Sequence, residues 1–166
     1  MCGRCYLLVL VLVSCRADPS EEGAPPEYEQ ALAHFGRGEY ALARALCQSA
    51  LETRPDYVEC YRIAAAALVV EGAEEEGLAL YRRALELDPD YAVVHSDLGC
   101  LYALLGRQQE ALGHLERAVE LAPGAAFVHY NLGRVRESLG FYRRSEAAYL
   151  GALAEDAEDA RIWAGL

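Results

Sequence analysis

Apolar side chains recur at intervals of three and four residues through most of this chain. The clearest stretch runs from Ala92 to Pro123, with an apolar stripe on each side of Gly106. Such spacings place side chains on one face of a helix, and glycine and proline commonly mark helix ends. The stretch therefore predicts two helices joined by a turn at Gly106. Neither helix can bury its apolar face alone, so a neighbouring helix pair is expected.

The helix pair recurs along the chain with a period of 34 residues. Prolines and turn glycines mark the same two points of successive repeats: Pro55, Pro89 and Pro123, and Gly38, Gly72, Gly106 and Gly140. Small residues also recur at two positions of the second helix: Ala43, Gly77, Ala111 and Ser145, and Ala50, Ala84, Ala118 and Ala152. Small side chains suit places where two helices approach closely, so the period predicts a series of packed hairpins.

This pattern resembles the tetratricopeptide repeat family, whose unit is a 34-residue helical hairpin with small residues, a turn glycine and a closing proline. On the family's pattern the repeats are 24–57, 58–91, 92–125 and 126–159. The third is closest to type, and edge repeats are expected to drift. The resemblance implies an all-α fold, a right-handed α-solenoid of four hairpins over 26–159. Residues 160–166 would begin a short C-terminal capping helix.

The start of the chain does not follow the repeat pattern. Tyr6 to Val13 is an unbroken apolar run, far shorter than the roughly 20 residues that a membrane-spanning helix needs. Residues 1–14 are therefore predicted to be a signal peptide. Leu12 to Cys15 resembles the lipobox of bacterial lipoproteins, which implies attachment of lipid such as palmitate to Cys15. An ordinary secretory signal with an incidental Cys15 is the alternative.

Residues 15–25 are predicted to form a tether, because acidic segments rich in proline and glycine stay extended. Arg16 follows Cys15, and by the sorting habit of enteric lipoproteins this favours the outer membrane. The predicted address is the bacterial cell envelope, lipid-anchored at the outer membrane and facing the periplasm. A secreted protein is the alternative.

Charge and cysteine content narrow the function classes. All fifteen basic residues are arginine, against 26 acidic ones, and the net charge is −11. Strong nucleic-acid binding is not expected, because it needs a clustered basic face.

Beyond Cys15 the chain has no Cys-x-x-Cys pair, so no metal or cofactor is predicted. Cys47 and Cys60 could form a bridge in an oxidising compartment, or could be small buried hydrophobes like Cys100.

Histidine and acidic residues offer little support for catalysis. His95, Ser96 and Asp97 are the residue types of a hydrolase triad, but helix neighbours point about 100° apart and cannot form a relay. His95 and His129 occupy one repeat position where the family buries an aromatic ring, so both are predicted to pack in the core. Glu74 to Glu76 is predicted to mark a helix start, where acidic side chains favour the dipole.

The family resemblance implies a concave groove lined by the first helix of each hairpin. The groove positions in the second, third and fourth repeats are Glu59, Arg62, Ala66, Val69 and Val70; Val93, Ser96, Cys100, Ala103 and Leu104; and Phe127, Tyr130, Arg134, Glu137 and Ser138. Asn131 lies where many family members place an asparagine that bonds a ligand's backbone. The family's carboxylate clamp needs lysines, and this chain has none.

The arginines Arg62 and Arg134 are predicted to flank the small, apolar middle of the groove. Its aromatic walls are predicted to be Tyr28, Phe127 and Tyr130. Such a surface suits a peptide or helix with an apolar stripe and one or two carboxylates. The alternative is that some of the apolar groove residues pack between repeats, namely Val69, Val70 and Leu104.

The sequence thus predicts a protein-interaction scaffold at the cell envelope. A structural role is the first alternative, in which the exposed C-terminal end near Trp163 pairs with a second copy to form a homodimer. An enzyme is the second alternative. It would need titratable residues that converge in a closed pocket, which an open trough rarely supplies.

Overall fold

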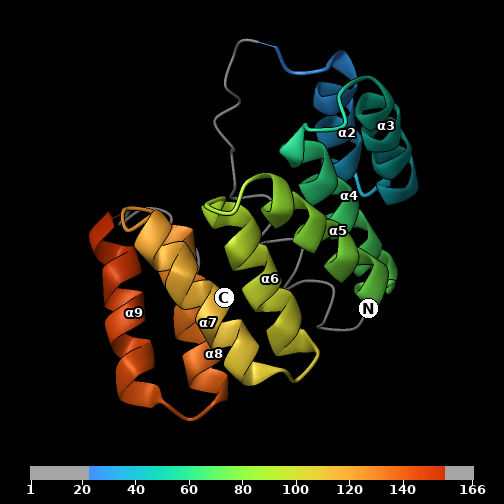
Figure 1. Ribbon diagram of the computed structural model, residues 1–166. Helices are drawn as coiled ribbons and strands as arrows, with labels where there is room; N and C mark the ends of the chain where they lie inside the picture. The colour runs from blue at the N-terminus through green and yellow to red at the C-terminus, as the bar shows by residue number, and fades with distance from the viewer. Residues whose placement is uncertain (1–22, 156–166) are drawn as a thin grey trace. The chain divides into compact units, whose positions relative to one another are not determined.

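The computed structural model describes residues 23–155, and every regular element in that range is a helix (Figure 1). The helices are α2 (Pro26–Gly36), α3 (Tyr40–Thr53), α4 (Val58–Glu71), α5 (Glu74–Leu87), α6 (Ala92–Leu104), α7 (Gln108–Leu121), α8 (Ala126–Ser138) and α9 (Tyr142–Glu155). The predicted all-α fold class is confirmed. None of these helices combines the length and apolar character needed to cross a membrane.

Several predicted features lie outside the described residues. These are the signal peptide at 1–14, the lipid site at Cys15, most of the tether at 15–25, and the capping segment at 160–166 with Trp163.

The chain divides into two compact units, Met1–Pro89 and Asp90–Leu166. In the first unit α2 pairs with α3 and α4 with α5, and α3 also packs against α4. In the second unit α6 pairs with α7 and α8 with α9, while α8 contacts both α6 and α7. Each unit is therefore built from two helical hairpins.

The four hairpins turn in the same way. The turn glycines Gly38, Gly72, Gly106 and Gly140 have φ angles of 79°, 88°, 74° and 76°, in the left-handed region that glycine adopts without steric cost. The residue after each glycine donates its amide to the carbonyl five residues earlier. These bonds are Glu39 to His34 at 3.0 Å, Ala73 to Leu68 at 2.9 Å, Arg107 to Tyr102 at 2.8 Å, and Phe141 to Arg136 at 2.9 Å. Each bond satisfies a carbonyl at a helix end, and all four keep the 34-residue period.

Two of the three closing prolines, Pro55 and Pro123, accept a second repeated hydrogen bond that the sequence did not suggest. The Tyr61 hydroxyl donates to the Pro55 carbonyl at 3.0 Å. His129 occupies the same repeat position, and its Nε2 donates to the Pro123 carbonyl at 2.7 Å. His129 is therefore only partly buried, whereas His95 is buried as predicted. In both cases a ring from a first helix fixes the end of the preceding repeat.

Small residues, Gly77 among the predicted ones and Gly99 in addition, lie where helices approach closely. A Cβ added to Gly77 would lie 2.5 Å from Cγ2 of Val69, and one added to Gly99 would lie 2.5 Å from Cγ of Leu115. The alanines at the two small positions are buried: Ala43, Ala50, Ala84, Ala111, Ala118 and Ala152. Val69 is buried against Gly77 within its own hairpin, so its side chain contributes to helix packing.

Cys47 on α3 and Cys60 on α4 are buried free thiols. A hydrogen bond with Cys60, together with burial, raises the pKa of the Cys47 thiol. In this structure the two residues therefore act as small buried side chains between neighbouring helices. Glu74 to Glu76 occupy the first turn of α5, as predicted.

The Gly77 contact gives a test of the hairpin packing. Gly77→Ala should lower the free energy of unfolding by about 1–3 kcal/mol, because the new methyl group meets Val69 and also the Ala65 carbonyl oxygen at 2.9 Å. The matched control is Gly113→Ala in α7, where a Cβ meets nothing within 4 Å. This control should raise the free energy of unfolding by about 0.5–1 kcal/mol. Urea unfolding followed by circular dichroism measures both, and equal effects would contradict the packing described.

Candidate partner-binding surface

In the second unit, the predicted groove residues lie on α6 and α8, the first helices of its two hairpins. These helices contact each other, and a buried hydrogen bond joins them. Asn131 Nδ2 donates to Ser96 Oγ at 2.9 Å. The asparagine predicted to bond a ligand thus already uses one amide proton to hold the two helices together.

The other nine predicted residues on these helices are all at least partly exposed. They are Val93, Cys100, Ala103 and Leu104 on α6, and Phe127, Tyr130, Arg134, Glu137 and Ser138 on α8. Of these two contacting helices, α6 therefore carries partly exposed apolar side chains, and α8 carries aromatic and charged ones. That these residues bind a partner stays a prediction.

Four side chains of α8 and α9 form what we call the Tyr130 cluster, made of Tyr130, Arg134, Glu137 and Tyr149. The Arg134 guanidinium lies over the Tyr130 ring, 5.8 Å from its centroid. The Tyr130 and Tyr149 rings are 5.7 Å apart between centroids, and the Tyr149 hydroxyl donates to Glu137 at 2.8 Å. The pKa of Tyr149 is raised to about 12; burial has the largest effect and the hydrogen bond to Glu137 the next largest.

In the first unit, the predicted groove residues of α4 are less accessible. Ala66 and Val69 are buried, Glu59 and Val70 are partly exposed, and Arg62 is 1% exposed. Arg62 lies beside the buried ring of Tyr28. Burial raises the pKa of Tyr28, while the charge of Arg62 and its hydrogen bond to the phenol oppose that rise. Arg62 and Tyr28 therefore form a buried polar pair in this structure, although the sequence had suggested a flank and a wall of an open groove.

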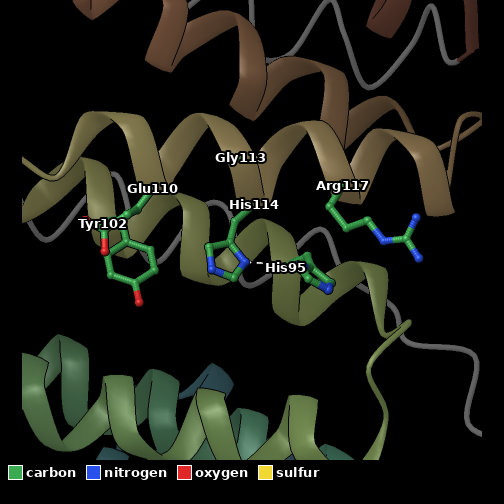
Figure 2. A pocket seen from close by; sticks show the side chains of 6 residues that line it. All are labelled: His95, Tyr102, Glu110, Gly113, His114 and Arg117. Atoms are coloured by element: carbon green, nitrogen blue, oxygen red, sulfur yellow. Dashed lines mark hydrogen bonds between the residues drawn. The ribbon is translucent and has the colours of Figure 1, made fainter.

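A hollow of about 330 Å³ lies along the α6–α7 hairpin (Figure 2). It is lined by His95, Tyr102, Glu110, Gly113, His114 and Arg117. The Tyr102 ring stacks on the His114 ring, with centroids 5.3 Å apart, and the Arg107 guanidinium lies over Tyr102. His114 had no place in the sequence predictions. It could have been found only by noticing that it faces His95 across the hairpin, 19 residues away.

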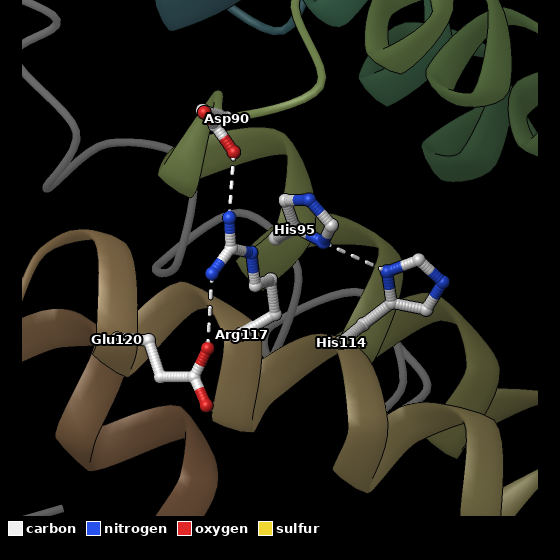
Figure 3. A network of polar contacts seen from close by, with 5 residues as sticks. All are labelled: Asp90, His95, His114, Arg117 and Glu120. Carbon is white, nitrogen blue, oxygen red and sulfur yellow. Dashed lines mark hydrogen bonds and ion pairs between the residues drawn. The ribbon is translucent and has the colours of Figure 1, made fainter.

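Polar contacts fix the side chains around this hollow (Figure 3). Nδ1 of His95 and Nδ1 of His114 are 3.0 Å apart, so one imidazole donates and the other accepts. Arg117 bridges two carboxylates, donating to Asp90 at 2.6 Å and to Glu120 at 3.0 Å.

Among the three residues considered as a triad, His95, Ser96 and Asp97, Ser96 accepts a hydrogen bond from Asn131 of α8. Over residues 23–155, no three or more histidine, cysteine or acidic side chains converge where a metal ion could bind.

The raised pKa of Tyr149 gives a test of the Tyr130 cluster. Glu137→Gln removes the carboxylate, so the pKa of Tyr149 should fall below about 12 yet stay above 10.0, because burial remains. The pKa of Tyr149 is higher in the folded protein than in the unfolded chain. The contribution of this phenol to the free energy of unfolding is therefore fully present below pH 10.0 and is lost as the pH rises through about 12. Nuclear magnetic resonance titration of the tyrosine rings, assigned with Tyr149→Phe, measures the shift. A pKa that Glu137→Gln leaves unchanged would contradict the contact.

Comparison with known families gives a consistent result. Two tetratricopeptide repeat models match residues 28–92 and 80–113, which together span just over half of the chain. No curated protein matches the chain in sequence.

Solved structures share the fold. A thermophilic TPR protein of Thermus thermophilus superposes with a TM-score of 0.77 and 24% identity, over 96% of this chain and 88% of that one. PilF of Pseudomonas aeruginosa gives a TM-score of 0.74 and 23% identity, over 79% and 60% of the two chains. YrrB, a TPR protein with an unusual peptide-binding site, superposes with a TM-score of 0.66 and 20% identity. The match covers 84% of this chain and 73% of YrrB.

These likenesses identify the fold as that of a helical-hairpin solenoid. The two family matches, with the 34-residue period, show that the chain belongs to the tetratricopeptide repeat family.

Proposed function

We propose that this protein is an interaction scaffold that docks a peptide or helix of another protein on the surface formed by α6 and α8. The observation that carries the proposal is the Tyr130 cluster, in which a partly exposed ring and guanidinium are held together. Tyrosine and arginine are enriched among residues that dominate binding energy at interfaces. Membership of the repeat family and likeness in fold to a peptide-binding protein, YrrB, support the proposal.

The chemistry of the surface defines the partner. Ala103 and Leu104 of α6 offer apolar contact, and Arg134 offers a cation that can bond a carboxylate with two parallel hydrogen bonds. A partner segment with an apolar stripe and an acidic residue beside it satisfies both. We assign recognition of the partner's carboxylate to Arg134 rather than to Arg62, because Arg62 is buried beside Tyr28.

Peptides selected from a random displayed library against the full chain test this assignment. The selected peptides should combine apolar residues at helical spacing with an acidic residue, and Arg134→Glu should weaken their binding at least tenfold. The matched control is Arg37→Glu, an exposed arginine at the end of α2 that should leave binding unchanged. Peptides that bind the Arg134→Glu protein as tightly as the original would refute the groove assignment.

We further propose that the protein is lipid-anchored through Cys15 in a bacterial cell envelope, at the outer membrane and facing the periplasm. The support is the sequence Leu12 to Cys15 after a short apolar run, followed by an acidic tether rich in proline and glycine. Two or more acyl chains hold a protein stably on a membrane. The alternative is a secreted protein without lipid.

Metabolic labelling with an alkyne-bearing palmitate analogue tests the anchor. The full chain, expressed in a bacterium, should incorporate the label, and Cys15→Ser should abolish incorporation. Cys47→Ser is the matched control and should incorporate the label normally, because Cys47 is buried in the fold. An unlabelled original chain, or a label that survives Cys15→Ser, would refute the lipid anchor.

A structural, self-associating role is a second candidate function. It is favoured by the large apolar side chains that α9 leaves exposed, Tyr142, Leu150 and Leu153.

A further inference from the structure

Two buried thiols meet where the first two hairpins pack together. Cys47 lies on α3, the second helix of the first hairpin, and Cys60 lies on α4, the first helix of the second hairpin. Both residues are 0% exposed, and α3 packs against α4 within the first unit (Figure 1). A hydrogen bond joins the two thiols, so their sulfur atoms face each other across the contact between the hairpins.

The repeat pattern shows that these two positions do not require cysteine. The residues at the same positions of the later repeats are Tyr81 and Val94, and Leu115 and Val128. All four are buried, and the helices that carry Leu115 and Val128, α7 and α8, pack against each other as α3 and α4 do. Larger apolar side chains therefore satisfy the packing at these positions, and the first two repeats instead carry a cysteine on both sides of one contact.

We propose that Cys47 and Cys60 are oxidised to a disulfide that links the first hairpin to the second, and that the thiol pair described above is the reduced form. Packing alone can be satisfied by a single cysteine or by none, whereas a bridge needs both sides of one contact to be cysteine and to face each other. Disulfides form and persist in oxidising compartments. The bridge lies in the first unit and is independent of the docking surface on α6 and α8.

A disulfide-bearing small molecule, such as oxidised glutathione, supplies the chemistry. The thiolate of one cysteine attacks a sulfur of the oxidant, which forms a mixed disulfide and releases one thiol of the oxidant. The thiolate of the second cysteine then attacks the sulfur of the first, which forms the protein disulfide and releases the second thiol. The two protons of the cysteine thiols pass to the two released thiols. Two electrons pass from the cysteines to the oxidant, whose disulfide is reduced.

Burial determines when this reaction occurs. The thiolate is the reactive form of cysteine, and in the folded chain the hydrogen bond with Cys60, and then burial, raise the pKa of the Cys47 thiol. The fold also leaves both residues without exposed surface. Oxidation therefore takes place while the first unit folds and its thiols still meet the solvent, so the oxidant has to be present during folding.

Folding of the full chain in a glutathione redox buffer tests the bridge. The chain is reduced in urea and diluted into the buffer with a non-ionic detergent, because of the apolar run at Tyr6 to Val13. It is then denatured, alkylated and digested. Trypsin does not cut between Arg54 and Pro55, so one tryptic peptide, 45–62, carries Cys47 and Cys60 and no other cysteine. This peptide should be recovered unalkylated, with a mass lower by two hydrogens than that of the reduced peptide.

The bridged chain should keep native helicity by circular dichroism. Its urea unfolding midpoint should exceed that of the reduced chain by about 1 M, because the bridge restricts the unfolded chain. The matched controls are Cys60→Ala, whose midpoint should be the same in the redox buffer and in reductant, and Cys100→Ala, which should keep the difference. Cys100 lies on α6, apart from the pair.

Three results would overturn the proposal. They are a peptide 45–62 that is alkylated at both cysteines after oxidative folding, a bridged chain without native helicity, and a bridged chain whose unfolding midpoint is no higher than that of the reduced chain. The experiment uses a purified chain and a defined oxidant. Its outcome is therefore distinguishable from failure of the lipid anchor or of the peptide-docking surface.

Discussion

The close approach of two helices at small residues is the constraint on which the rest of the structure depends. At Gly77 and Gly99, a single additional carbon would collide with a side chain of the partner helix. The equivalent positions of the other hairpins hold buried alanines or, in the fourth hairpin, Gly133 and the buried Ser145. Because the second helix of each hairpin lies so close to the first, each hairpin buries one apolar face and presents its remaining surfaces to neighbouring hairpins or partners.

Features set by local backbone geometry could be predicted from the sequence. Gly38, Gly72, Gly106 and Gly140 mark turns because glycine alone adopts their positive φ angles without cost, and the prolines follow helix ends because proline cannot continue a helix. The all-helical fold and the acidic first turn of α5 follow from equally local rules. A 34-residue period made these signals unusually clear, since each occurs several times.

Features set by contacts between helices could not be predicted from position alone. Arg62 was expected beside an open groove, but the ring of Tyr28 from another helix lies against it, and its side chain is buried. Asn131 was expected to bond a ligand, and its amide also donates to Ser96 of the neighbouring helix. The His95–His114 contact joins residues that no sequence motif relates. These pairings depend on side-chain length and direction across a helix interface, which the repeat register does not specify.

The central claim is that four equal hairpins fold by one repeated geometry, and native-state hydrogen exchange tests it most directly. The amides of Glu39, Ala73, Arg107 and Phe141 lie just outside helices or at their edges, and each bonds the carbonyl five residues earlier. The structure predicts that all four exchange slowly, at intervals of 34 residues, while the amides of neighbouring loop residues without such bonds exchange fast. Fast exchange at these four amides would contradict the repeated hairpin geometry.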